Sequence, residues 1–257
     1  MLPIVVSYPR TGSKIVTDIV YNYSKQYFSS EGCLQEFLLP GWYRQDNFKF
    51  QNHKIVGQYV DLPKELWHTI HNHRPINEIL DERISWLESN PNYVFKLMVN
   101  PRVPNKVYKY CLDTFDCIFL ERKDTVRSFL SFLFLSETKH HHEVGSNILE
   151  KAKTKIRFYE MLAETWVWDY NTFNQLKSQS KKSKSIIYED LLDNNQVSES
   201  ILLQKIGWKT TSDFVPCKFQ TIATPYADSN LLDYFTNPNE VISFMKKHNS
   251  IFKSLEI

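Results

Sequence analysis

The stretch IVVSYPRTGSKIVTDIV, residues 4–20, decides the fold predicted for this chain. Its first residues are apolar or small, which is typical of a strand buried on both faces in a parallel sheet. From Gly12 to about Phe28 the apolar residues recur at the spacing of one helix face. A strand that passes through Pro, Arg and Gly directly into a helix leaves backbone N–H groups unpaired at the helix start, and such groups favour an anion.

The rest of the chain repeats the alternation of strands and helices. Further strands are predicted at 93–99, 116–122 and 183–191, the last ending in a turn, and further helices at 75–89, 103–115, 123–135 and 148–177. Alternating strands and helices form right-handed βαβ units with a parallel sheet. The sequence therefore predicts an α/β protein with a central parallel β-sheet flanked by helices, as a single domain over residues 1–257.

The predicted strands also indicate where a ligand binds. In open parallel sheets, ligands bind beyond the carboxyl ends of the strands. The first strand runs into Arg10, the third ends at Arg122, and the fourth ends in Tyr188, Glu189 and Asp190. We therefore expect the functional site at this edge of the sheet.

Composition excludes several classes of protein. A formal net charge of +2 does not indicate a nucleic-acid-binding protein, and no apolar run approaches the ~20 residues of a membrane span. The N-terminal segment does not have the pattern of a signal peptide. The cysteines form no CxxC pair, which favours reduced thiols at Cys33, Cys111, Cys117 and Cys217. These features predict a cytoplasmic protein. The sequence does not distinguish a monomer from a homodimer.

The segment SYPRTGSK, residues 7–14, carries the groups that an anion site requires. Gly12 permits close approach of the backbone, Arg10 and Lys14 add positive charge, and Thr11 and Ser13 add hydroxyl donors. The alternative is an ordinary turn in which Ser13 caps the helix. The pattern GxxxxGK[ST] is absent, which disfavours an ordinary ATP or GTP hydrolase.

The residues YPRTGS, 8–13, resemble the 5′-phosphosulfate loop of sulfotransferases, enzymes that use 3′-phosphoadenosine 5′-phosphosulfate (PAPS). The resemblance implies a P-loop NTPase-like sulfotransferase fold, with Arg10 neutralising the oxygens of the transferred group. Lys14 stands where Thr is common in the family. By this resemblance the donor-binding residues of the loop are Pro9, Arg10, Thr11, Gly12, Ser13 and Lys14.

A second segment, FLERKDTVRSFLSF at 119–132, resembles the family's 3′-phosphate motif. It supplies Arg122 at a strand end and Ser131 on the following helix, while Asp124 is expected to cap that helix. The alternative for Arg122 is an exposed ion pair at the end of a strand.

Two later stretches resemble softer family motifs. IIYEDL, 186–191, places Tyr188 near the nucleotide. The stretch 217–235 offers Lys218 to the 3′-phosphate, and a solvated surface lysine is an equally good interpretation of this residue.

The general base is the point at which the sequence departs from the best-known family pattern. Many cytosolic sulfotransferases have Lys-Thr-His after the second strand; Lys96 matches the Lys, but Met98 stands at the His position and cannot accept a proton. The bacterial trehalose 2-sulfotransferase type uses a Glu shortly after the first helix, where this chain has Glu36. We therefore predict Glu36 as the base, with a surface glutamate as the alternative.

Histidines occur in two clusters, at His68, His71 and His73 and at His140 to His142. Neither cluster has carboxylate or Cys companions at a recognisable metal-ligand spacing. We interpret them as solvated or acceptor-lining residues, one of which is the base if Glu36 is not. No metal is predicted.

The resemblance implies in-line transfer of a sulfuryl group from PAPS to a hydroxyl or amine of a small-molecule or carbohydrate acceptor. The acceptor-facing insertion is predicted at 32–75, whose aromatic residues suit a sugar face, an apolar alcohol or a plain core. Two alternatives stay open: a nucleotide-dependent kinase of related fold, and a non-catalytic nucleotide-binding protein.

Overall fold

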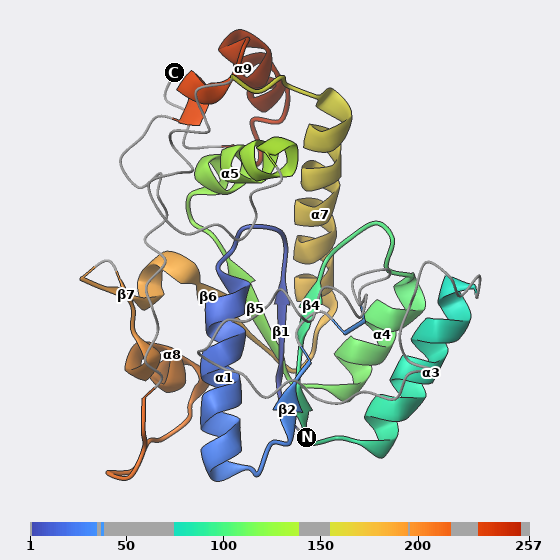
Figure 1. Ribbon diagram of the computed structural model, residues 1–257, viewed down its shortest axis with the longest axis vertical. Coiled ribbons are helices and arrows are strands. Elements are labelled where there is room, and N and C mark those ends of the chain that lie inside the picture. The colour runs from blue at the N-terminus through green and yellow to red at the C-terminus, as the bar shows by residue number, and fades with distance from the viewer. Residues whose placement is uncertain are drawn as a thin grey trace. The chain divides into compact units, whose positions relative to one another are not determined.

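The computed structural model (Figure 1) describes residues 2–34, 37–38, 75–138, 155–194, 196–216 and 231–252. The chain forms two compact units. The first comprises Met1–Glu121 and Asp169–Gln220, and the second comprises Arg122–Trp168 and Thr221–Ile257. No helix of the described residues is both long enough and apolar enough to cross a membrane.

The first unit is built on a sheet of four parallel strands in the order β4-β1-β5-β6. Their bounds are β1 Ile4–Ser7, β4 Lys96–Met98, β5 Cys117–Glu121 and β6 Ser183–Ile187. Ser7 is in register with Met98 on one side and with Leu120 on the other. All four residues of β1 are fully buried, so the predicted central parallel sheet is confirmed.

Helices cover both faces of this sheet. Helix α1 (Ser13–Tyr27; blue in Figure 1) and α8 (Glu199–Ile206) pack on the face that Val5 and Ile118 present. The opposite face carries α7 (Glu160–Gln179), whose Phe173 ring centroid lies 5.5 Å from that of Phe119. Neighbouring residues on a strand point to opposite faces, which is why strands as apolar as these are buried on both sides.

The described part of the first unit contains further helices and strands. These are α3 Ile76–Ser89, α4 Asn105–Thr114, the 3₁₀ helix Tyr188–Leu191, and the strand pairs β2 (Gly32–Cys33) with β3 (Tyr93–Val94) and β7 (Leu192–Asp193) with β8 (Gln196–Val197). The predicted strand 93–99 is thus divided at Phe95. The first part, β3, pairs with β2, and the second part, β4, pairs with β1.

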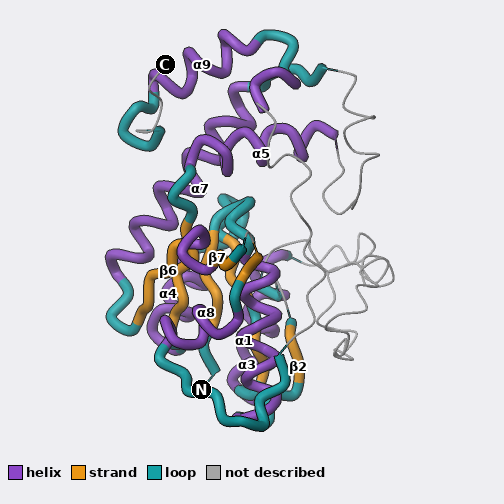
Figure 2. The backbone as a smooth tube through the Cα atoms, turned by 90° about the vertical axis from the view of Figure 1, so that its left-hand side faces the viewer, coloured by secondary structure: helices purple, strands orange, loops and turns teal. Residues whose placement is uncertain are grey.

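The second unit contains α5 (Thr125–Thr138), the first turns of α7, the 3₁₀ helix Leu231–Tyr234 and α9 (Pro238–Lys247). Figure 2 shows its described residues as helices and connecting loops. Its core is aromatic: the ring centroid of Phe129 lies 5.4 Å from that of Trp166 and 5.0 Å from that of Phe252.

The long helix predicted at 148–177 begins later than predicted. Residues 155–159 are described and are not helical, and α7 begins at Glu160. The Ile156 N–H donates to the Tyr234 carbonyl at 2.8 Å, and the Ile156 carbonyl accepts from the Thr236 N–H at 2.8 Å. These bonds to a distant segment hold Ile156 extended, which local periodicity does not reveal.

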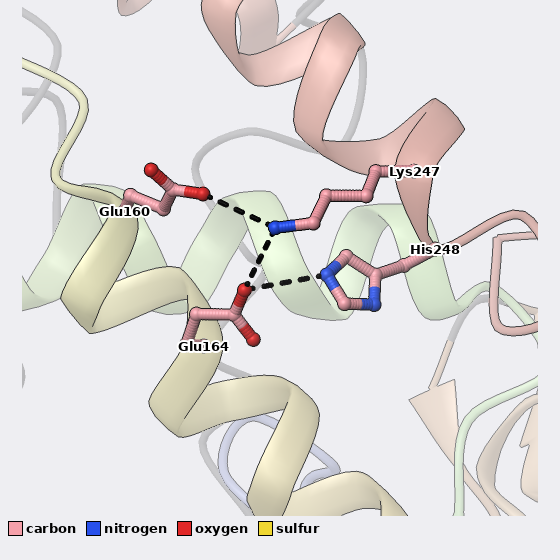
Figure 3. Close-up of polar contacts among 4 residues, drawn as sticks. All are labelled: Glu160, Glu164, Lys247 and His248. Carbon is pink, nitrogen blue, oxygen red and sulfur yellow. Dashed lines mark hydrogen bonds and ion pairs between the residues drawn. The ribbon is translucent and has the colours of Figure 1, made fainter.

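Charged side chains join the end of α9 to the start of α7 within this unit (Figure 3). Lys247 Nζ lies 3.4 Å from both Glu160 Oε1 and Glu164 Oε1, and His248 Nε2 lies 3.5 Å from Glu164 Oε1. Because Lys247 and Glu160 are mostly exposed, we expect the ion pair between them to add little to stability.

Candidate functional site

The loop from Tyr8 to Gly12 leaves β1 at the carboxyl edge of the sheet and leads directly into α1. Two of its residues have left-handed backbone conformations, Arg10 with φ 68° and Gly12 with φ 81°. A positive φ is uncommon for any residue other than Gly and marks a backbone held by its surroundings. The loop is therefore a tight double bend.

Within the part of the chain that the structure describes, no side chain caps the start of α1, where Gly12 is the N-cap residue. Ser13 is already helical, so the alternative interpretation, in which Ser13 caps the helix, is wrong. The first N–H groups of α1 consequently have no side-chain cap, and they lie at the positive end of the helix dipole. This arrangement suits a phosphate or another oxyanion.

The loop's own side chains hold its shape. The Thr11 hydroxyl is buried and donates to the Tyr8 carbonyl at 3.1 Å. The Tyr8 ring is fully buried, with edge-to-face contacts to Tyr170 at 5.4 Å and Phe173 at 5.0 Å between centroids. Because the Thr11 hydroxyl hydrogen is engaged inside the loop, we expect Thr11 to meet an anion through its backbone N–H.

Tyr188 lies against the loop, although it follows Gly12 in the sequence by 176 residues. A β-carbon on Gly12 would lie 2.2 Å from Tyr188 Cε2 and 2.6 Å from Tyr188 Cδ2. The structure thus brings together two residues that sequence analysis assigned to one nucleotide site. Gly12 is required both by its positive φ and by this contact.

Two lysines make the surroundings of the loop basic. Lys96 is buried on β4, paired in register with Val5 of β1. Burial lowers the pKa of Lys14; the carboxylate of Asp18 opposes this effect and the charge of Lys96 adds to it. The Lys14 ammonium group makes no hydrogen bond or ion pair within the described residues, so it is available to an added anion.

The residues of the second predicted motif belong to the second unit. Arg122 directly follows β5, and Ser131 lies on α5. Asp124 Oδ1 accepts from the Arg127 N–H at 2.8 Å, which confirms that Asp124 caps this helix. The participation of Arg122 and Ser131 in a common site with the loop stays a prediction.

Several predicted residues lie outside the part of the chain that the structure describes. They are Glu36, Lys218, Cys217, most of the proposed insertion at 32–75, and the histidines His68, His71, His73 and His140 to His142. Among the residues described, no group of His, Cys, Asp and Glu could hold a metal ion. Cys33, Cys111 and Cys117 are free, as predicted.

The structure adds a residue that sequence analysis did not single out. Asp169 on α7 is buried in the first unit, and among the described residues its Oδ1 has no hydrogen-bond partner. Burial raises the pKa of Asp169 to about 8. Burial also raises the pKa of the nearby Tyr108, and the carboxylate of Asp169 adds to that effect. Nothing in the local sequence TWVWDYN, 165–171, distinguishes this acid from one on an exposed helix face.

Comparisons with known proteins give structural likeness at low sequence identity. No protein-family model matches the chain, and no curated protein matches its sequence. Mouse sulfotransferase SULT7A1 complexed with PAP is similar over 98% of this chain and 85% of its own, at 13% identity and a TM-score of 0.43.

Two solved structures of retinol dehydratase are also similar. The complex with retinol and PAP has 14% identity, covers 99% of this chain and 82% of that one, and gives a TM-score of 0.46. The complex with androsterone and inactive cofactor PAP has 13% identity, coverage of 100% and 82%, and a TM-score of 0.47. Since these similarities are weak, any inference about function has to be based on the residues of the loop Tyr8–Gly12.

Proposed function

We propose that this chain is a sulfotransferase that moves a sulfuryl group from PAPS to a hydroxyl or amine of a small-molecule or carbohydrate acceptor. The observation that supports this most directly is the loop Tyr8–Gly12, a double bend that ends at the uncapped start of α1. Its sequence resembles the family's 5′-phosphosulfate loop, and its geometry suits an oxyanion.

In this proposal the loop holds the 5′ end of the donor. Backbone N–H groups from Thr11 to Lys14 bind the 5′-phosphate, and Pro9 restricts the backbone before the first bend. Arg10 and Lys96 neutralise the charge on the transferred group, and Lys14 adds a cation that Thr would not supply. Transfer of such a group depends chiefly on positioning and charge stabilisation.

The remaining donor contacts are assigned by resemblance. Arg122 and Ser131 bind the 3′-phosphate, an arrangement in which the guanidinium forms paired charge-assisted hydrogen bonds. Tyr188 lies beside the nucleotide, and Lys218 adds a further cation. The contact of Tyr188 with Gly12 supports only the assignment of Tyr188.

The reaction requires an acceptor oxygen or nitrogen to attack sulfur while the bond from sulfur to the bridging oxygen of the 5′-phosphate breaks. The acceptor's proton passes to a base, and the products are the sulfated acceptor and 3′-phosphoadenosine 5′-phosphate (PAP). We assign the base to Glu36, because Met98 occupies the end of β4 where many family members have His.

The second candidate is a non-catalytic nucleotide-binding protein, which the methionine at position 98 favours. A nucleotide-dependent kinase is less well supported, since the loop lacks GK[ST]. Turnover with a broad panel of acceptors separates the first two, because a binding protein would bind the donor and transfer nothing.

The decisive experiment is calorimetric titration with PAP beside ADP and ATP. Tight binding of PAP together with much weaker binding of ADP, which lacks a 3′-phosphate, would support the donor assignment. If ATP bound as tightly as PAP, the kinase would replace the sulfotransferase. If no nucleotide bound, the loop would be only a turn.

A further inference from the structure

A cavity of about 780 Å³ lies in the first unit at the amino ends of β1, β5 and β6. This is the edge of the sheet opposite the loop Tyr8–Gly12, because the strands are parallel. Its floor is apolar, formed by buried residues at and near the strand starts that include Leu2, Cys117 and Ile118. The cavity is within the size range of small-molecule sites, roughly 300–1,000 Å³.

One wall of the cavity is aromatic. Phe28 and Trp208 meet edge to face with ring centroids 5.5 Å apart, and both line the cavity. Trp208 is held from behind by stacking on Tyr23 at 4.5 Å. Phe28 nevertheless remains 48% exposed. A fixed aromatic surface that still faces solvent offers a contact to a planar apolar group.

Another part of the cavity lining is basic. It comes from the lysine-rich stretch KSQSKKSKS, 177–185, which the proposed transfer reaction does not use. Lys181, Lys182 and Lys184 line the cavity, against a single acid, Asp116. Lys184 Nζ donates to the Ile206 carbonyl. The side chains of Lys181 and Lys182 form no hydrogen bond or ion pair within the described part of the chain.

We propose that this cavity is a second ligand site, which binds a small aromatic anion. The ring lies on Phe28 and Trp208, and the acidic group lies between the ammonium groups of Lys181 and Lys182. An uncharged aromatic compound would use only half of the site, and a small inorganic anion only the other half. The site lies at a different edge of the sheet from the donor loop, so this proposal does not depend on the proposed function.

The test uses the fluorescent aromatic sulfonate 8-anilinonaphthalene-1-sulfonate and its uncharged analogue N-phenyl-1-naphthylamine, each titrated with PAP present at saturation. We expect the sulfonate to bind at one site per chain and PAP not to displace it. The double variant Lys181→Glu/Lys182→Glu should weaken sulfonate binding by roughly tenfold or more and leave the uncharged probe little changed. Lys155→Glu/Lys246→Glu carries the same change in net charge away from the cavity and should bind as the original protein does.

A separate variant tests the role of the aromatic wall. Phe28→Ala should weaken both probes several-fold, whereas Tyr159→Ala, a residue of similar exposure at 45%, should weaken neither. Sulfonate binding that survives the double lysine change, or that PAP abolishes, would overturn the proposal. If the original protein bound the sulfonate but did not bind PAP, only the proposed donor site would be contradicted.

Discussion

The ring of Tyr188 occupies the space that a side chain on Gly12 would need, with Cε2 only 2.2 Å from the position of a β-carbon. This contact joins the 3₁₀ helix after β6 to the start of α1. It makes the shape of the loop Tyr8–Gly12 depend on a residue far away in the sequence.

The first prediction follows from this contact. Gly12→Ala adds a side chain at a positive φ, which costs about 1–2 kcal/mol, and also forces Tyr188 to move. We expect it to weaken PAP binding by roughly tenfold or more. The double variant Gly12→Ala/Tyr188→Ala removes the clash but not the backbone strain, so its unfolding free energy should exceed that expected from adding the single changes. Strict additivity in chemical denaturation would show that the two residues do not interact.

Two substitutions of Arg10 separate the effect of its charge on sulfuryl transfer from the effect of its backbone strain on stability. Both Arg10→Ala and Arg10→Gly remove the guanidinium group, so both should abolish sulfuryl transfer. Only Gly is relaxed at φ 68°, and Arg10→Gly should therefore be the more stable variant by about 1 kcal/mol. Transfer assays and urea unfolding measure the two effects independently. Near-normal turnover in either variant would remove Arg10 from the catalytic site.

Arg122→Ala tests the proposed 3′-phosphate contact. Loss of a charge-assisted hydrogen bond costs about 1.5–3 kcal/mol, so the KM for PAPS should rise roughly tenfold or more. Arg157→Ala removes the same kind of side chain from an exposed position in the same unit and serves as the control. A KM equal in the two variants would assign the 3′-phosphate to other residues.

Glu36→Gln keeps the size of the side chain and removes its ability to accept a proton. We expect kcat to fall by roughly 10²-fold or more while PAP binding stays unchanged. The measurement is steady-state transfer beside calorimetric titration of PAP. Full activity would direct the search for the base to the histidines.

Asp169 predicts how stability depends on pH. Burial raises the pKa of Asp169 from 3.8 to about 8, so the folded state holds this proton more tightly than the unfolded state. Its contribution to stability is complete below pH 4 and is lost as the pH rises towards 8, at up to about 1.4 kcal/mol per pH unit. Asp169→Asn should flatten this slope in urea unfolding between pH 5 and 8. Asp213→Asn, at an exposed acid, should not, and an unchanged slope in the first variant would contradict the assignment.

The sequence predicted the central part of the fold because its signals there are local. Residues 4–20 contain both an apolar strand and a helix of clear periodicity, and both formed as expected. The division of strand 93–99 at Phe95 and the extended conformation of Ile156 depend on partners distant in the sequence. No local pattern encodes those partners.

The candidate site also has a part that the sequence predicts and a part that it does not. The loop was recognisable from its residue types, whereas the contact between Tyr188 and Gly12 requires the packed structure. The role of Asp169 was not predicted, because an acid among aromatic residues has the pattern expected of the polar face of an amphipathic helix. Only its burial, at 1% exposure, shows that it is unusual.

The loop between β1 and α1 has a further consequence for the energetics of recognition. The Tyr8 ring, the Thr11 hydroxyl and the Gly12–Tyr188 contact already fix its bends. Ordering the backbone of a residue costs about 1–2 kcal/mol in conformational entropy, so the five residues Tyr8–Gly12 represent several kcal/mol. That entropy is lost when the chain folds. Under the proposed function, a donor phosphate would therefore meet a loop that is already ordered, and the loop dipoles would need no reorganisation.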